Sequence, residues 1–268
     1  MPLFKKADKP PALYRGGALS YQVANQQHIG RRERQEDSFG LVNPFDVTAI
    51  RKDGLLAVVA DGMGGMEDGA EISEAAVEMC RDIFRLINRK GDIAFQLRSA
   101  MYRIDDALFD RYLGRGGTTI VIAMIYDERL YWYSIGDSAI YLRRGGILFK
   151  LNIEQNVRTR LYLDELFEEA ETDRQRAEAD PDGVRLTQFL ASGQLKEVDG
   201  CFVPLTLKDG DVILMCSDGV NGIISDARLL ELLDNPARNA AKLIEREILA
   251  ENNPRQDNFT SVIIRCCI

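Results

Sequence analysis

The chain has 268 residues, 46% of them hydrophobic and 28% charged, which is the composition of an ordinary globular protein rather than a disordered or fibrous one. Asp and Glu number 42 against 34 Lys and Arg, so the formal net charge is −8. Nucleic acids and anionic membranes attract clustered positive charge, and neither is therefore an expected partner. No apolar run approaches the ~20 residues of a membrane-spanning helix, and the first residues lack the apolar region of a signal peptide.

Cysteine and histidine usage narrows the possible chemistry. The five cysteines form no C-x-x-C pair and fall mostly within apolar runs, which favours buried thiols in a reducing cytoplasm. The only histidine is His28. A His-rich zinc site is excluded, and a Ser-His-Asp hydrolase would depend on this one residue without a G-x-S-x-G motif. We expect a cytoplasmic protein in which His28 has no catalytic role.

The chain begins with residues 1–16, which are polar and interrupted by Pro and Gly, and they predict a flexible leader. The remainder, residues 17–268, is expected to form a single domain. Strand-like apolar runs recur at residues 55–60, 118–126, 130–135, 139–143, 212–217 and 259–266. Residues 118–126 are apolar on both alternating faces, which predicts a central strand buried on both sides.

Helical periodicity is clearest after residue 70. Apolar residues between 72 and 87 recur at alternating steps of three and one, and these steps make one stripe along a helix. A second helix fits the apolar spacing of residues 97–108, and a turn at Gly91 would join the two into a hairpin. Asn235-Pro236 predicts the N-cap and the first residue of a later helix.

Residues 161–179 interrupt the strand pattern because they are dense in Glu, Asp and Arg. They predict a solvated helix, and a mobile flap spanning about 154–180 beside an active site is the alternative. Elsewhere, only Asp127-Glu128 separates two strands, so antiparallel pairing must be common. The predicted elements do not alternate regularly between strand and helix. Their order is strands, a helix pair, strands, the insertion, strands, helices and a last strand, which predicts an α+β fold.

Carboxylates recur at the ends of the predicted strands. They stand in Glu36-Asp37, Asp61-Gly62, Gly136-Asp137, Asp218-Gly219 and Asp257-Asn258, and Arg32 lies close to the first pair. Each aspartate taken singly is ordinary turn chemistry, and Asp137 in particular could simply cap a turn. Taken together, they could meet at one rim of packed sheets.

Clustered carboxylates repel one another and cannot all remain ionised without cations between them. Oxygen-only ligands select hard divalent ions such as Mg²⁺ or Mn²⁺ over zinc. Two such ions ~3.5–4 Å apart activate water against a phosphoester, and a nearby arginine offers a bidentate fork to phosphate. The residues alone therefore predict a two-metal phosphohydrolase.

Six segments in the same order resemble the motifs of the PP2C family of metal-dependent Ser/Thr protein phosphatases, especially its bacterial members. They are residues 30–39 (GRRERQEDSF), 58–65 (VVADGMGG), 116–119 (GGTT), 135–138 (IGDS), 216–220 (CSDGV) and 257–260 (DNFT). Each motif is weak alone, but six in order are specific and run through most of the chain. The implied fold is two packed antiparallel β-sheets flanked by helix pairs, an α-β-β-α sandwich.

The resemblance also implies roles for single residues. Asp61 would bridge two Mn²⁺ or Mg²⁺ ions, and the Gly62 carbonyl would coordinate one of them. Asp218 and Asp257 would be further ligands of one ion. Glu36 and Asp37 would hold metal-bound waters or lie behind the ligands. Asp137 would contact a possible third ion. Arg32 would hold the phosphate oxygens. The catalytic residues would thus be Arg32, Asp37 and Asp61.

The chain departs from the family pattern around these positions. Met63 and Met66 stand where some members have histidine, and Ala139 stands where an arginine is frequent. The usual Asp-His-Ser before the flap is replaced by residues 154–156, Glu-Gln-Asn, and the flap itself, 157–179, is unusually charged. These changes surround the ligand positions without removing them, so they bear on substrate choice and rate.

The expected activity is hydrolysis of phosphoserine and phosphothreonine in proteins, opposite a Ser/Thr kinase. A water or hydroxide between the two ions would attack phosphorus in line, without a phospho-enzyme. Two alternatives are a catalytically weak pseudophosphatase that acts as a binding or regulatory module, and a two-metal hydrolase of small phosphoesters such as nucleotides.

Overall fold

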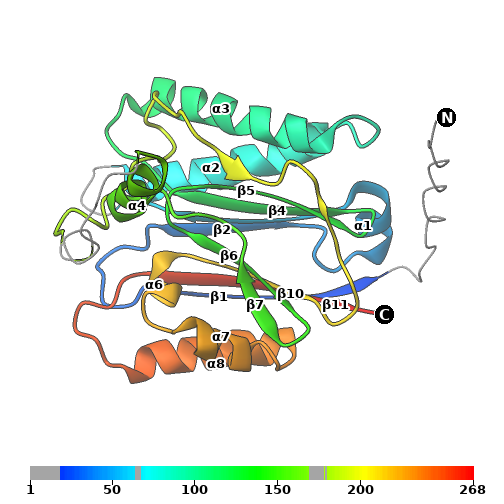
Figure 1. Cartoon of the computed structure of the whole chain (residues 1–268). Coiled ribbons are helices and arrows are strands. Elements are labelled where there is room, and N and C mark those ends of the chain that lie inside the picture. The colour runs from blue at the N-terminus through cyan, green and yellow to red at the C-terminus, as the bar shows by residue number, and fades with distance from the viewer. Residues whose placement is uncertain (1–18, 64–67, 169–177, 179) are drawn as a thin grey trace, which may run out of the picture.

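The computed structural model describes residues 19–63, 68–168, 178 and 180–268. All of the expected leader (residues 1–16), part of the expected flap and Met66 lie outside these ranges. Within them, two antiparallel sheets are stacked face to face, with helices on the outer side of each (Figure 1). The predicted α+β sandwich is confirmed.

Each sheet draws its strands from distant parts of the chain. One has the order β2 (Asp37–Val42), β3 (Leu55–Asp61), β4 (Ile120–Tyr126), β5 (Arg129–Ile135), β8 (Asp199–Gly200), with β9 (Leu205–Thr206) also paired to β5. The other has the order β1 (Ser20–His28), β11 (Phe259–Cys267), β10 (Val212–Cys216), β6 (Ala139–Arg144), β7 (Ile147–Lys150). The first and last strands of the chain are therefore neighbours.

A helix pair covers the outer face of each sheet (Figure 1). The pair α2 (Gly69–Leu86) and α3 (Ile93–Tyr112) lies on the first sheet, and the pair α7 (Asp226–Leu232) and α8 (Ala237–Ala250) lies on the second. The remaining described helices are α1 (Val47–Asp53), α4 (Val157–Glu168) and α6 (Asp218–Asn221). Of the helices in the described ranges, none is both long and apolar enough to cross a membrane.

Burial explains why β4 is apolar on both faces. Its residues Ile120–Ile125 are all at most 1% exposed, because one face packs on the other sheet and one on the helix pair. Burying a large aliphatic side chain contributes ~1.5–3 kcal/mol. The predicted central strand is confirmed, but it begins at Ile120 rather than at residue 118.

Two boundaries differ from the prediction for reasons of capping. The helix expected to have Asn235 as N-cap begins at Ala237, because the Asn235 side chain donates to the carbonyl of Leu232 instead and closes the preceding helix. The helix expected over residues 161–179 begins earlier, at Val157. There, Asn156 Oδ1 accepts a hydrogen bond from the Thr159 amide at 2.9 Å and caps the first turn.

Strand direction brings several chain segments to one edge of the sandwich. In the first sheet β3 ends where β2 begins, with Asp61 opposite Asp37, and β5 ends where β4 begins. In the second sheet β10 ends where β11 begins, with Cys216 opposite Ser261. Since antiparallel neighbours reverse direction, the ends and starts of these strands all meet at this edge.

Candidate active site

A small, strongly acidic pocket of about 150 Å³ lies at this edge. Seven of the eight expected site residues line it: Arg32, Glu36, Asp61, Gly62, Asp137, Asp218 and Asp257. The other lining residues are Met63, Thr119, Leu186 and Asn258. Asp37, the eighth expected residue, lies beside the pocket and does not line it. The structure therefore brings all the expected residues but one to the wall of a single pocket.

Asp61 is the last residue of β3, and two threonines hold its backbone. Its amide donates to Thr119 Oγ1 at 3.1 Å, and its carbonyl accepts from Thr118 Oγ1 at 2.9 Å. Gly62 follows, and its amide donates to the Glu36 carbonyl at 3.1 Å. A Cβ at Gly62 would lie 2.5 Å from the Gly69 carbonyl oxygen, so only glycine fits this crowded crossing.

Asp37 is buried, only 4% exposed, behind Asp61. Ser217 Oγ donates to its Oδ2 at 2.7 Å, whereas its Oδ1 has no hydrogen-bond partner among the described residues. Burial raises the pKa of Asp37 to about 6. A buried carboxylate oxygen without a partner is costly unless a proton or a cation satisfies it.

Asp218 is the first residue of the short helix α6, which Ser217 separates from the buried strand β10. Burial and then the nearby charge of Asp257 raise its pKa. Asp137 follows β5 at a turn in which Gly136 has φ +98°, a conformation that favours glycine. Burial raises the pKa of Asp137 to about 7, with further contributions from the charges of Asp218 and Glu154.

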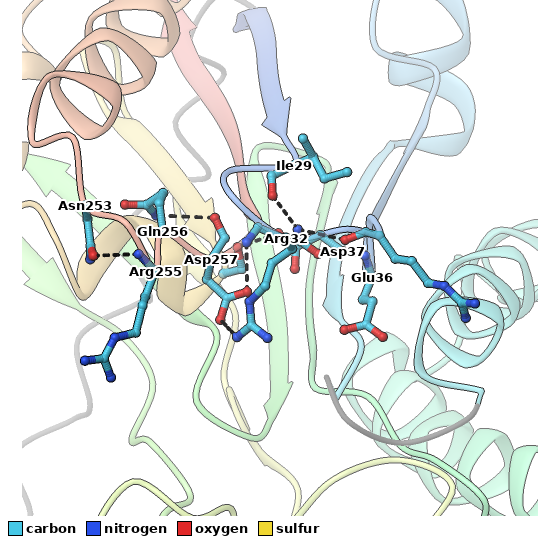
Figure 2. Close-up of polar contacts among 11 residues, drawn as sticks. Ile29, Arg32, Glu36, Asp37, Asn253, Arg255, Gln256 and Asp257 are labelled. Carbon is cyan, nitrogen blue, oxygen red and sulfur yellow. Dashed lines mark hydrogen bonds and ion pairs between the residues drawn. The ribbon is translucent and has the colours of Figure 1, made fainter.

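An ion pair joins Arg32 to Asp257, with Arg32 Nη2 2.6 Å from Asp257 Oδ2 (Figure 2). Both side chains are about half exposed, at 48% and 41%. The Glu36 carboxylate points into the same space from the neighbouring loop (Figure 2). Asn258 ties these loops together: its Oδ1 accepts from the Glu36 amide at 2.7 Å, and its Nδ2 donates to the Ile29 carbonyl at 2.8 Å.

The donor set fits a hard divalent cation. The lining carboxylates and the Gly62 carbonyl offer only oxygen ligands, and burial together with the charges of Asp37, Asp218, Asp137 and Asp257 raises the pKa of Asp61 well above its ordinary value. Within the described ranges no three acidic, cysteine or histidine side chains are arranged to hold an ion by themselves. Mg²⁺ commonly keeps several waters and takes only one or two carboxylates, so a water-rich ion suits this pocket.

Several residues that shape the site carry no predicted role. Ser217 and Asn258 are adjacent in sequence to Asp218 and Asp257, and Thr119 lies within the GGTT segment. Their side chains orient backbone and carboxylates through the hydrogen bonds above. The signal that could have found them is a polar residue at the buried end of a strand, where an unpaired hydroxyl or amide is costly.

Comparison with known proteins identifies the family. The model of the protein phosphatase 2C family matches residues 25–253. Serine/threonine phosphatase stp of Listeria monocytogenes is 25% identical over 241 residues, which cover 87% of this chain and 90% of that protein. Protein phosphatase PhpP of Streptococcus pneumoniae is 27% identical over 215 residues, which cover 78% of this chain and 85% of that protein.

Solved structures agree with the sequence relatives. The serine/threonine phosphatase PstP/Ppp of Mycobacterium tuberculosis has a TM-score of 0.73 at 25% identity, over 92% of this chain and 98% of that one. The catalytic domain of the serine/threonine protein phosphatase PstP in complex with two manganese ions has the same score and identity, over 94% of this chain and 100% of that one. As its six motifs predicted, the chain belongs to the protein phosphatase 2C family.

Proposed function

We propose that this protein is a metal-dependent protein serine/threonine phosphatase that uses Mn²⁺ or Mg²⁺. The observation that carries the proposal is the acidic, oxygen-only pocket with Arg32 at its margin, in a chain of the protein phosphatase 2C family. The similar proteins from Listeria and Streptococcus are named as phosphatases, and a similar solved structure holds two manganese ions. This is the activity expected from the sequence.

The proposed metal ligands are the pocket carboxylates. Asp61 and the Gly62 carbonyl would hold the ions, Asp218 and Asp257 would complete the ligands of one of them, and Glu36 would contribute from the adjacent loop. Asp37, which lies behind Asp61, would orient the ligands rather than face the substrate. A pair of such ions supplies Lewis acidity that lowers the pKa of water and offsets the charge of phosphate. With Asp218, Asp137 is proposed to serve a third ion.

Arg32 is proposed to bind the phosphate group of the substrate. Its guanidinium is half exposed and now pairs with Asp257. Opening of this pair frees the carboxylate for a cation and the guanidinium fork for two phosphate oxygens. Arg32 would thereby hold and orient the phosphoryl group above the carboxylates, which is positioning of the kind that phosphoryl transfer requires.

The proposed substrates are Ser/Thr-phosphorylated proteins, and a Ser/Thr kinase is the proposed opposing enzyme in a signalling pair. Action in the cytoplasm is supported by the five cysteines, all of which are free thiols. If the physiological substrate were instead a small phosphoester, a nucleotide would compete with a phosphothreonine peptide at a lower concentration than a second peptide does.

The test is phosphate release from a phosphothreonine peptide with Mn²⁺, by the wild type and by Asp218→Asn. Asp82→Asn is the matched control, because it makes the same chemical change on a carboxylate that is 70% exposed on α2. We expect metal-dependent turnover in the wild type and the control, and a loss of about a hundredfold or more in Asp218→Asn. An inactive wild type at every metal concentration would favour the pseudophosphatase.

A further inference from the structure

A second and larger cavity lies beside the acidic pocket. It measures about 750 Å³ and is bounded by α4, by residues 153–156 and by the returning segments 187–188 and 196–199. We call it the flap cavity. Its volume lies in the range of pockets that take up small ligands or side chains, and no element of the proposed catalytic machinery fills it.

The flap cavity and the acidic pocket share one wall. Leu186 lines the pocket and the next residue, Thr187, lines the cavity. This strand-like segment is held by the Thr187 amide, which donates to the Gln155 carbonyl at 2.8 Å, and by a bridge from Leu186 to Asn156. A peptide bound with its phosphate in the pocket therefore has neighbouring residues within reach of the cavity.

Gln155 connects the cavity wall to the site itself. Its Oε1 accepts from the Gly136 amide at 2.9 Å, and its Nε2 donates to the Glu197 carbonyl at 3.2 Å. The Gln155 amide also donates to the Gly136 carbonyl at 2.9 Å. The turn that presents Asp137 is thus held to the wall of the flap cavity by two hydrogen bonds.

Among the charged residues that line the flap cavity, four are acidic and two, Arg160 and Lys196, are basic. Two of the carboxylates have partners outside the lining cations, since Glu154 pairs with Lys150 and Asp199 accepts from the Ile153 amide. Arg160 is already engaged, since its Nε lies 2.8 Å from Asp164 Oδ1 while its Nη1 lies 3.9 Å from Glu197 Oε1. Glu197 is 66% exposed and makes only this long contact with a cation among the described residues. Its carboxylate is therefore available to a ligand.

Apolar side chains complete the lining. Ile153, which is 53% exposed, and Leu163 stand beside the carboxylates. A long aliphatic stem that ends in a cation complements such a surface, because the stem packs on the aliphatic groups while the charge meets the carboxylates. Lysine and arginine have this form, whereas an acidic side chain would be repelled.

We infer that the flap cavity is the subsite for the segment of the substrate protein next to the phosphorylated residue, and that it selects a lysine or arginine there. This inference rests on the proposed phosphatase function. An extended peptide spans ~3.3–3.6 Å per residue, so a side chain within about four positions of the phosphothreonine can reach a cavity that shares a wall with the pocket.

The test uses phosphothreonine peptides that differ only in one flanking residue, which is Arg, Ala or Glu at each of about four positions on either side. The full chain is assayed with Mn²⁺, and kcat/KM is measured for each peptide. At one position or two neighbouring ones we expect Arg to exceed Glu by about five- to tenfold, since partly exposed charge pairs are individually modest.

Two variants assign that preference to the cavity. Glu197→Lys should reverse the order of the Arg and Glu peptides, and Glu197→Gln should flatten it. Asp82→Lys is the matched control, since Asp82 is an exposed carboxylate that also pairs with an arginine but lies on α2. Hydrolysis of para-nitrophenyl phosphate, which has no flanking residues, should stay unchanged in all three variants.

The outcomes separate the two proposals. Wild-type turnover with no flanking preference, or a preference that Glu197→Lys leaves intact, overturns the subsite and leaves the phosphatase function standing. Equal losses on peptides and on para-nitrophenyl phosphate overturn it as well, because Glu197 would then support the catalytic pocket. An inactive wild type on every substrate overturns the proposed function itself.

Discussion

Neutralising one carboxylate of the acidic pocket should stabilise the protein when metal is absent. Asp137→Asn is the chosen change, because the aspartate lies at a turn after β5 and is proposed for a third ion rather than as the central ligand. Burial, followed by the charges of Asp218 and Glu154, raises its pKa from 3.8 to about 7. The folded protein without metal therefore pays for an ionised carboxylate in this position, and an amide removes that cost.

The magnitude and its pH dependence follow from the pKa. One pKa unit corresponds to ~1.4 kcal/mol, so the shift of Asp137 sets an upper limit of about 4 kcal/mol on the gain. A carboxyl whose pKa is raised on folding holds its proton more tightly in the folded state, so the wild type loses stability as the pH rises from about 4 towards 7. The gain from Asp137→Asn should be near zero at pH 4 and about 2–4 kcal/mol above pH 7.

Urea unfolding in EDTA at several pH values measures this difference. Asp105→Asn is the control, because Asp105 is buried and accepts from the amides of Ser192 at 2.9 Å and Leu195 at 3.3 Å. That variant should lose stability, by about 1–3 kcal/mol, since a buried hydrogen-bond acceptor is impaired. If Asp137→Asn were destabilising, or stabilising by the same amount at every pH, the electrostatic reasoning would be refuted.

Three further variants test other parts of the structure. Arg32→Ala should raise KM for a phosphopeptide about tenfold, because the guanidinium that binds phosphate is lost. It should also tighten Mn²⁺ binding measured by calorimetry, since it removes the cation that pairs with Asp257. Weaker Mn²⁺ binding would contradict this. Ile122→Ala in β4 should cost about 2–5 kcal/mol in urea unfolding, whereas Phe95→Ala, 68% exposed on α3, should cost far less. Deleting residues 165–178, most of which lie outside the described ranges, should change peptide preference and spare Mn²⁺ affinity; a collapse of that affinity would make the segment part of the core.

The carboxylates of the site were predictable because local turn chemistry marks them. Asp61, Asp137 and Asp218 each follow a run of buried apolar residues, so their positions at strand ends can be seen without knowledge of the fold. For Asp37 the sequence left two places open, contact through a metal-bound water or a position behind the ligands. In the structure Asp37 lies behind Asp61, where it accepts from the hydroxyl of Ser217.

The pairing of Arg32 with Asp257 could not be predicted from local pattern. This pairing depends on the position of β1. That strand is half exposed and rich in Gln and Asn, so its sequence lacks the apolar alternation that predicts a strand. This strand is stabilised by its pairing with β11, in which His28 lies opposite Phe259. That register places the loop after β1 beside the residues before β11, so the two ends of the chain together complete the pocket.

The pocket also lacks an imidazole among its described lining residues, and this has a testable chemical consequence. His28 stacks on Phe259 with ring centres 5.2 Å apart, and its Nδ1 accepts from the Gly30 amide, so it has a structural role outside the pocket. Met63, which does line the pocket, cannot donate a proton to a departing alkoxide. Substrates whose leaving group is a basic alkoxide, such as phosphothreonine, should therefore be hydrolysed slowly by this protein.

Met63→His would supply the missing acid. It should accelerate hydrolysis of a phosphothreonine peptide by about tenfold or more, because general acid catalysis typically contributes 10²–10⁴-fold when well placed. Hydrolysis of para-nitrophenyl phosphate should change little, since its leaving group departs without a proton. Met63→Leu, which changes shape and not acidity, should accelerate neither substrate. If Met63→His sped up both substrates equally, the gain would lie in binding, and the absence of an imidazole would not be what limits the natural enzyme.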